Sequence, residues 1–284
     1  MIIKIILFIV GIVIAISLIN FILYVHPPRY ASAAKPSDFG LRYEPVTLQT
    51  KDSIALAGWF VPNNKSQDVI LVLHGYPFDK GNILPAVRFL AGNFSLMLVD
   101  FRYFGESAGA YTTVGHKEVM DVEAAVAYLK ARNFKNIGII GFSLGASAAL
   151  LANPDVKAIV ADSPYATLEN MMRRIYSLFP GFLKEPFVAL TRLYARILLG
   201  IDTKAVAPLA TVDSIAARLL LVHGENDTQI PVENSVQLYE KADKSRTELW
   251  IIKNADHGSY LETAEYKQRI TAFFKEAFRA QATA

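Results

Sequence analysis

The pentapeptide G-F-S-L-G at residues 141–145 constrains the fold of this chain more than any other feature. The apolar run at 136–140 leads directly into it and predicts a buried strand, and the small residues that follow predict a helix. This pattern is typical of a sharp, strained strand-to-helix turn that lifts one serine hydroxyl clear of the backbone. The flanking glycines are needed because the strand and the helix approach too closely for a Cβ atom. We therefore expect Ser143 to be a nucleophile.

Composition excludes several classes of function. The 284 residues suit one large α/β domain or two small ones. A net charge of +3 without any block of lysine and arginine gives no sign of a nucleic-acid partner. The chain contains no cysteine, which excludes disulfides, thiol nucleophiles and thiolate metal ligands. The hydrophobic content of 52% is high for a soluble enzyme, and part of the excess lies in one segment.

That segment is an apolar run at residues 5–25, interrupted only by Ser17 and Asn20. About 20 apolar residues span the core of a bilayer as a helix, so we expect a transmembrane anchor at 1–26 and a linker at 27–43. The alternative is a cleaved signal peptide, because A-S-A at 31–33 resembles a cleavage site. However, the run is longer than the 7–15 residues usual in signal peptides. We expect the N-terminus inside and the remaining chain on the extracytoplasmic side.

From residue 44 onward, short apolar strands alternate with helical patterns. The expected strands cover residues 46–50, 54–61, 68–73, 94–99, 136–141, 157–160, 218–222 and 247–252. The expected helices cover residues 81–93, 117–132, 143 onward, 232–242 and 261–280. This alternation predicts an α/β fold at 44–284, with a mostly parallel sheet and helices on both faces.

An insert at about 163–213 carries two amphipathic helical patterns and several arginines. We expect a small helical lid. One interpretation is that its apolar side only packs on the domain. The other is that this side lines an acyl-chain pocket while its arginines lie near lipid headgroups.

A serine hydroxyl becomes a strong nucleophile only when a base takes its proton and an acid orients that base. Downstream of Ser143, Asp227 and His257 each follow an apolar strand, so all three are expected at the same edge of the sheet. We assign Asp227 as the acid and His257 as the base. Asp162 and Glu225 are alternative acids. We expect Asp256 to order its loop rather than to act as the acid of the triad.

The developing oxyanion needs hydrogen-bond donors. We expect the backbone N–H groups of Leu144, directly after the nucleophile, and Tyr76, after an early strand. His74 is expected to hydrogen-bond the backbone of this loop, and His223 to be structural or exposed. Asp100 and Arg102 are expected to fix their loop through an ion pair rather than to contact substrate.

From residue 44 to its end the chain resembles the α/β-hydrolases, in which the triad also follows the chain order Ser, Asp, His. The matching segments are 74–75, 100–107, 141–145, 223–231 and 256–258. The chain is similar to small membrane-tethered serine hydrolases of the Bem46-like and acyl-peptidase-like branch. That branch usually has glycine where this chain has Tyr103, in the pattern D-x-R-G-x-G-x-S. The resemblance implies ester, thioester or amide hydrolysis without a metal or cofactor.

We therefore expect a membrane-anchored, lipase-like carboxylic-ester hydrolase that acts on small-molecule or lipid esters through an acyl-enzyme. A peptidase or thioesterase with the same triad is one alternative. A non-catalytic, membrane-bound binding module is the other.

Overall fold

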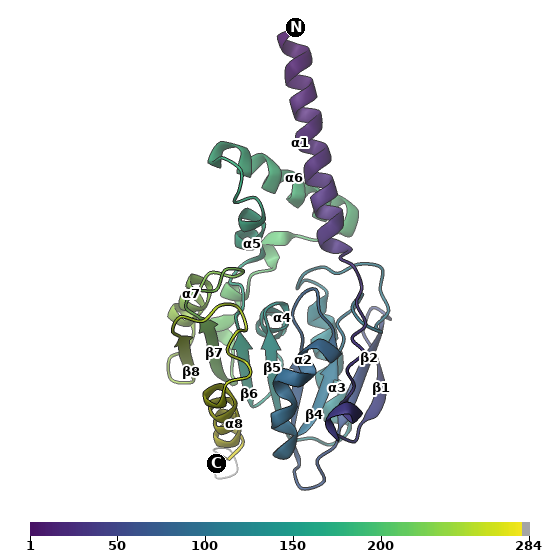
Figure 1. Ribbon diagram of the computed structural model, residues 1–284, viewed down its shortest axis with the longest axis vertical. Coiled ribbons are helices and arrows are strands. Elements are labelled where there is room, and N and C mark those ends of the chain that lie inside the picture. The colour runs from purple at the N-terminus through teal and green to yellow at the C-terminus, as the bar shows by residue number, and fades with distance from the viewer. Residues whose placement is uncertain (280–284) are drawn as a thin grey trace.

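The computed structural model describes residues 1–279, which form an eight-stranded sheet with helices on both faces (Figure 1). The strands are β1 (Glu44–Gln49), β2 (Ala55–Val61), β3 (Asp68–Leu73), β4 (Ser95–Val99), β5 (Asn136–Phe142), β6 (Ala158–Asp162), β7 (Arg218–Gly224) and β8 (Thr247–Ile252). They lie in the order β1-β2-β4-β3-β5-β6-β7-β8, and only the β1–β2 and β2–β4 pairs are antiparallel. The predicted mostly parallel sheet is confirmed.

The helices that follow these strands also agree with the sequence pattern. They are α2 (Lys80–Val87), α3 (Glu118–Ala131), α4 (Leu144–Ala152), α5 (Leu168–Ile175), α6 (Gly181–Leu199), α7 (Glu233–Lys241) and α8 (Ala264–Arg279). The expected helix at 81–93 is shorter, because its second half is a 3-10 turn, Arg88–Gly92. The last residue predicted to be helical, 280, lies outside the described residues.

The central strands are continuously apolar because both faces of the sheet are covered. In β5, Ile137 and Ile139 belong to one core, and Ile140 and Phe142 belong to the other. The first core is closed by α3, α4 and α7, and the second by α2 and α8. Parallel strands sandwiched in this way bring all their carboxyl ends to one edge of the sheet.

Helix α1 (Ile2–Val25) stands away from the sheet, and its N-terminal end projects from the rest of the molecule (Figure 1). Within the described residues it is the one helix that is long and apolar enough to cross a membrane. Its second half packs beside α6. Tyr194 of α6 lies with its ring centroid 5.8 Å from that of Phe21 and its hydroxyl 3.2 Å from that of Ser17.

The residues that follow α1 are held against the α/β domain. The Arg29 guanidinium donates hydrogen bonds of 2.8 Å to the backbone oxygens of Gly105 and Ser107. The Tyr103 hydroxyl donates to the oxygen of Pro27 at 2.6 Å. These hydrogen bonds fix the position at which α1 joins the α/β domain.

Candidate active site

Ser143 lies in a strained turn between β5 and α4. Its backbone has φ 51° and ψ −110°, a conformation that residues with a Cβ atom rarely adopt. A Cβ atom at Gly141 would lie 2.5 Å from the oxygen of Gly145, and one at Gly145 would lie 2.5 Å from the oxygen of Leu73. Gly141 is required by the close approach of β5 and α4, as the sequence predicted, whereas Gly145 is required by the approach of α4 to the end of β3.

The structure brings Asp227 and His257 together at the same edge of the sheet. His257 Nδ1 lies 2.6 Å from Asp227 Oδ2. Asp227 Oδ1 accepts hydrogen bonds from the backbone N–H groups of Gln229 and Ile230 at 2.9 and 2.7 Å. Burial would raise the pKa of this carboxyl, but hydrogen bonds from His223, His257 and Ile230 outweigh burial and hold the pKa well below its usual range. Asp227 is therefore ionised at neutral pH and orients the imidazole.

Ser143 follows β5 at this same edge and is partly exposed. Within residues 1–279 its hydroxyl makes no hydrogen bond with His257. In enzymes without substrate, catalytic hydrogen bonds are often long and tighten only when the substrate binds.

His223, which was expected to be structural or exposed, is a buried structural neighbour of the site, and its contact with Asp227 was not predicted. It is fully buried at the end of β7, where Nε2 lies 3.3 Å from Asp227 Oδ2 and 2.8 Å from the oxygen of Ile230. Its Nδ1 lies 2.7 Å from the Ser235 hydroxyl. A histidine within an otherwise apolar strand indicates a buried hydrogen-bond partner, and Asp227 four residues later is that partner.

The alternative acids have other partners. Asp162 accepts hydrogen bonds from the hydroxyls of Tyr260 and Tyr266, at 2.6 and 2.7 Å. Glu225 accepts from the backbone N–H of Asn254 at 3.0 Å. Asp256 accepts from backbone N–H groups of its own and a neighbouring loop, as expected of a loop-ordering carboxylate. No group of three or more acidic or histidine side chains in the described residues is arranged to hold a metal ion.

The loop after β3 lies against the turn that holds Ser143, since a Cβ atom at Gly75 would lie 3.3 Å from Ser143 Cβ. His74 Nε2 accepts a hydrogen bond from the N–H of Phe101 at 3.0 Å, so its Nδ1 carries the proton and donates to the oxygen of Gly75 at 2.8 Å. Burial lowers the pKa of His74 and keeps it neutral. The hydrogen bonds of residues 1–279 include none that the N–H groups of Tyr76 and Leu144 donate.

The loop after β4 is fixed by ion pairs, although not by the one that the sequence suggested. Asp100 pairs with the buried Lys80 ammonium at 2.6 Å, whereas Arg102 pairs with Asp52 and Asp121, each at 2.7 Å. The expected role in fixing the loop is right, but the partners are different.

Tyr103 occupies the position where the similar branch usually has glycine. Its φ of 74° lies in the left-handed region that favours glycine. The loop therefore keeps the glycine conformation despite the side chain. Its ring lies 6.1 Å from the ring of His26, between centroids, and its hydroxyl binds Pro27. The substitution thus ties the end of α1 to the loop.

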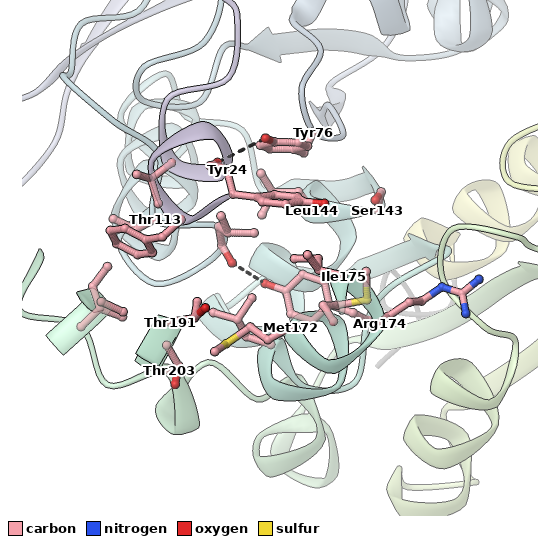
Figure 2. A pocket seen from close by; sticks show the side chains of 18 of the residues that line it. Tyr24, Tyr76, Thr113, Ser143, Leu144, Met172, Arg174, Ile175, Thr191 and Thr203 are labelled. Carbon is pink, nitrogen blue, oxygen red and sulfur yellow. Dashed lines mark hydrogen bonds between the residues drawn. The ribbon is translucent and has the colours of Figure 1, made fainter. Parts of the chain in front are cut away.

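A pocket of about 550 Å³ opens beside Ser143. Figure 2 shows Ser143 and Leu144 on its upper side and Met172 and Thr191 on its lower side. The walls are mostly apolar and come from the turn at Ser143, the helices α5 and α6, the end of α1, and several loops that include Tyr76 and Ile230. The α1 residues in the wall are Phe21, Tyr24 and Val25. The Tyr76 hydroxyl donates to the oxygen of Tyr24 at 3.2 Å and so joins α1 to the loop after β3.

Comparison with known proteins agrees with this geometry. A model of the prolyl oligopeptidase family matches residues 104–281. An uncharacterised protein of Bacillus subtilis, YqkD, is 28% identical over 232 residues, which cover 77% of this chain and 74% of that protein. The protein bem46 of Schizosaccharomyces pombe is 24% identical over 153 residues, half of each chain.

Among solved structures, an esterase of Pyrococcus furiosus, Pf2001, is 30% identical, with a TM-score of 0.73. The alignment covers 89% of this chain and 98% of the esterase. The predicted similarity to α/β-hydrolases of the Bem46-like branch is confirmed.

Proposed function

This chain belongs to the prolyl oligopeptidase family of α/β-hydrolases, and we propose that it is a membrane-anchored serine hydrolase that cleaves carboxylic esters. The observation that carries the proposal is the hydrogen bond of 2.6 Å between His257 and Asp227, at the edge of the sheet that also holds the strained Ser143. The esterase activity in the name of the similar Pyrococcus furiosus protein supports the ester class.

In the proposed reaction, Ser143 Oγ attacks the acyl carbonyl while His257 Nε2 takes its proton. Asp227 holds the Nδ1–H tautomer and stabilises the imidazolium. The N–H groups of Tyr76 and Leu144 bind the oxyanion of the tetrahedral intermediate. His257 then protonates the leaving alcohol, and later takes a proton from the water that attacks the acyl-enzyme. These steps need no metal or cofactor.

The pocket supports an apolar acyl group as part of the substrate. Leu168, Met172, Ile175 and Tyr176 of the lid segment contribute apolar surface to its walls. Apolar pockets of this size close to a few polar groups are typical of ligand sites. We therefore favour the interpretation in which the lid lines an acyl-chain pocket.

We propose that residues 1–26 are an uncleaved anchor, residues 27–43 a linker and the residues from 44 onward the catalytic domain. Packing supports this over a cleaved signal peptide. The side chains of Ser17, Phe21 and Val25 in α1 are buried against the rest of the chain. Cleavage after residue 33 would expose the apolar surface that they cover. As part of the same proposal, the catalytic domain lies on the extracytoplasmic side, which protease digestion of sealed cells would test.

Turnover of p-nitrophenyl esters by purified protein and by its Ser143→Ala variant tests the proposal. We expect the variant to keep its circular dichroism spectrum and to lose essentially all turnover. Retained esterase activity in the variant would refute the assignment of Ser143.

The family description favours a peptidase as the second candidate, and matched ester, thioester and anilide substrates with one acyl group separate the three reactions. We expect the ester to give the highest kcat/KM. A folded protein that turns over none of them would favour a binding module instead.

A further inference from the structure

The packing of α6 against α1 places a limit on the depth of the lid. Tyr194 of α6 contacts Phe21 and Ser17, and its hydroxyl lies 3.2 Å from the oxygen of Ile14. Val13 packs on the apolar cluster that α5 and α6 share. The lid therefore lies beside α1 from about Val13 to Phe21, rather than only at its end (Figure 1).

The position along α1 at which the lid packs is inconsistent with a lid that lies in water. At about 1.5 Å per residue, residues 2–12 measure about 16 Å, which is roughly half of the ~30 Å hydrocarbon core. Residues 2–21 measure about 30 Å and match the core. If α1 spans the membrane, the level at which α6 packs must therefore lie inside the bilayer.

The side of α1 that faces away from the lid also indicates that this part of the helix lies in the membrane. At the level of the lid, the side chains of Ile16, Ile19 and Leu23 on that side are 36%, 57% and 58% exposed. No charged residue occurs between Lys4 and Arg29. Lipid covers these side chains only if the hydrocarbon region reaches down to the end of α1.

The lid itself presents an apolar surface to its surroundings. Leu193, Ile197 and Leu198 of α6 are 47%, 68% and 57% exposed, and Leu178 just before α6 is 95% exposed. Leu193 and Ile197 are four residues apart and so lie on one side of the helix.

The charges of the lid suit an interfacial position. Arg192 pairs with Glu169 at 2.8 Å, and Arg173 pairs with Glu185 at 3.0 Å, so two of its arginines are neutralised within the lid. The exposed Arg196 is long enough to extend its guanidinium to the headgroups. An amphipathic helix of this kind lies in the plane of the membrane, about 5–10 Å into the boundary between headgroups and acyl chains.

We infer that α6 is embedded in the same leaflet as the end of α1, and that the pocket receives its ester from that leaflet. The inference rests on the proposed function and specifies its substrate class, an ester that resides in the membrane. The pocket lies between these two helices, with Phe21 and Tyr24 of α1 and Ala195 and Leu199 of α6 in its walls. An acyl chain can therefore pass from lipid to Ser143 without crossing water.

Nitroxide depth measurements test the inference, and the absence of native cysteine makes single-cysteine labelling clean. Leu193→Cys and Ile197→Cys report on the lid, and Ile12→Cys, at a side chain that is 42% exposed, reports on the middle of the anchor. Asp155→Cys is the aqueous control, because its side chain is 96% exposed at the opposite edge of the sheet. Each full-length protein is reconstituted in vesicles of phosphatidylcholine and phosphatidylglycerol. Collision with oxygen is then compared with collision with a water-soluble nickel chelate.

We expect the labels at Leu193 and Ile197 to favour oxygen over nickel, at a shallower depth than the label at Ile12. Nickel accessibility at both lid sites equal to that at Asp155 would overturn the inference, and so would a water-accessible label at Ile12. These readings need no catalysis. Labelling of Ser143 by a fluorophosphonate in the same samples reports separately on the proposed function.

Discussion

At the scale of single residues, Asp227 is the most tightly determined part of the site. Its carboxylate accepts hydrogen bonds from His257 and from two backbone N–H groups, lies 3.3 Å from His223 Nε2, and belongs to a fully buried side chain. An ionised carboxylate held in this way fixes the imidazole in one tautomer. The proposed acid role depends on that charge and not on the shape of the side chain.

Asp227→Asn is expected to lower kcat for p-nitrophenyl esters by about 10³–10⁴-fold, because an amide favours the wrong imidazole tautomer. Circular dichroism should show an intact fold. Glu225→Gln is the matched control, because Glu225 is an acid in the same loop whose contact is to the backbone of Asn254. A larger loss of activity in Glu225→Gln than in Asp227→Asn would contradict the assignment.

Asp162 is the residue whose environment predicts a pH dependence. Burial raises its pKa to about 6, although Tyr260 and Tyr266 donate hydrogen bonds to it. The folded protein therefore binds this proton more tightly than the unfolded chain does. The stabilisation is complete below the unfolded pKa of about 4 and is lost as the pH rises through about 6.

We expect the free energy of unfolding of the wild type, relative to Asp162→Asn, to fall by roughly 3 kcal/mol or less between pH 4 and pH 7. Urea denaturation of both proteins at intervals of one pH unit measures this difference. Parallel stability curves for the two proteins would show that Asp162 does not titrate in this range.

At the scale of elements, the turn between β5 and α4 depends on the close approach of the start of α4 to the end of β3. Gly145→Ala would place a Cβ atom 2.5 Å from the oxygen of Leu73, which a backbone cannot relieve without moving. We expect it to lower the free energy of unfolding by about 3 kcal/mol, as overpacking does. Gly92→Ala is the control, because nothing lies within 4 Å of its Cβ position. Equal stabilities of the two variants in urea would exclude this explanation.

The end of α1 has a second role as a wall of the pocket, which gives a prediction on specificity. Phe21→Trp adds volume to that wall and should lower kcat/KM for decanoyl esters about tenfold relative to butanoyl esters. Leu23→Trp is the matched control, because Leu23 faces outward from the same turn and is 58% exposed. The same change of chain-length preference in both variants would mean that α1 acts through membrane binding and not through the pocket.

At the scale of the whole molecule, the sheet could be predicted because each central strand is an apolar run of five to seven residues. The positions of Asp227 and His257 at one edge followed from the topology, since they lie in the loops after the parallel strands β7 and β8. These predictions needed only local patterns and one rule for parallel sheets.

The contacts between distant segments could not be predicted in this way. The sequence pattern at Ser17 and Tyr194 does not indicate that their hydroxyls meet, across 177 residues of chain. The buried contact of His223 with Asp227 and the use of Tyr103 to hold the linker also depend on tertiary packing. The wall that α1 adds to the pocket depends on it as well. Sequence periodicity records which face of a helix is apolar, but not what covers it.

The most direct measurement is labelling of the purified full-length protein with a fluorophosphonate, read by mass spectrometry, with Ser143→Ala as the control. We predict a single labelled peptide that carries the adduct on Ser143, and no labelling in the variant. Folded wild-type protein that stays unlabelled, or that is labelled at another serine, would contradict the assignment of Ser143 as an activated nucleophile.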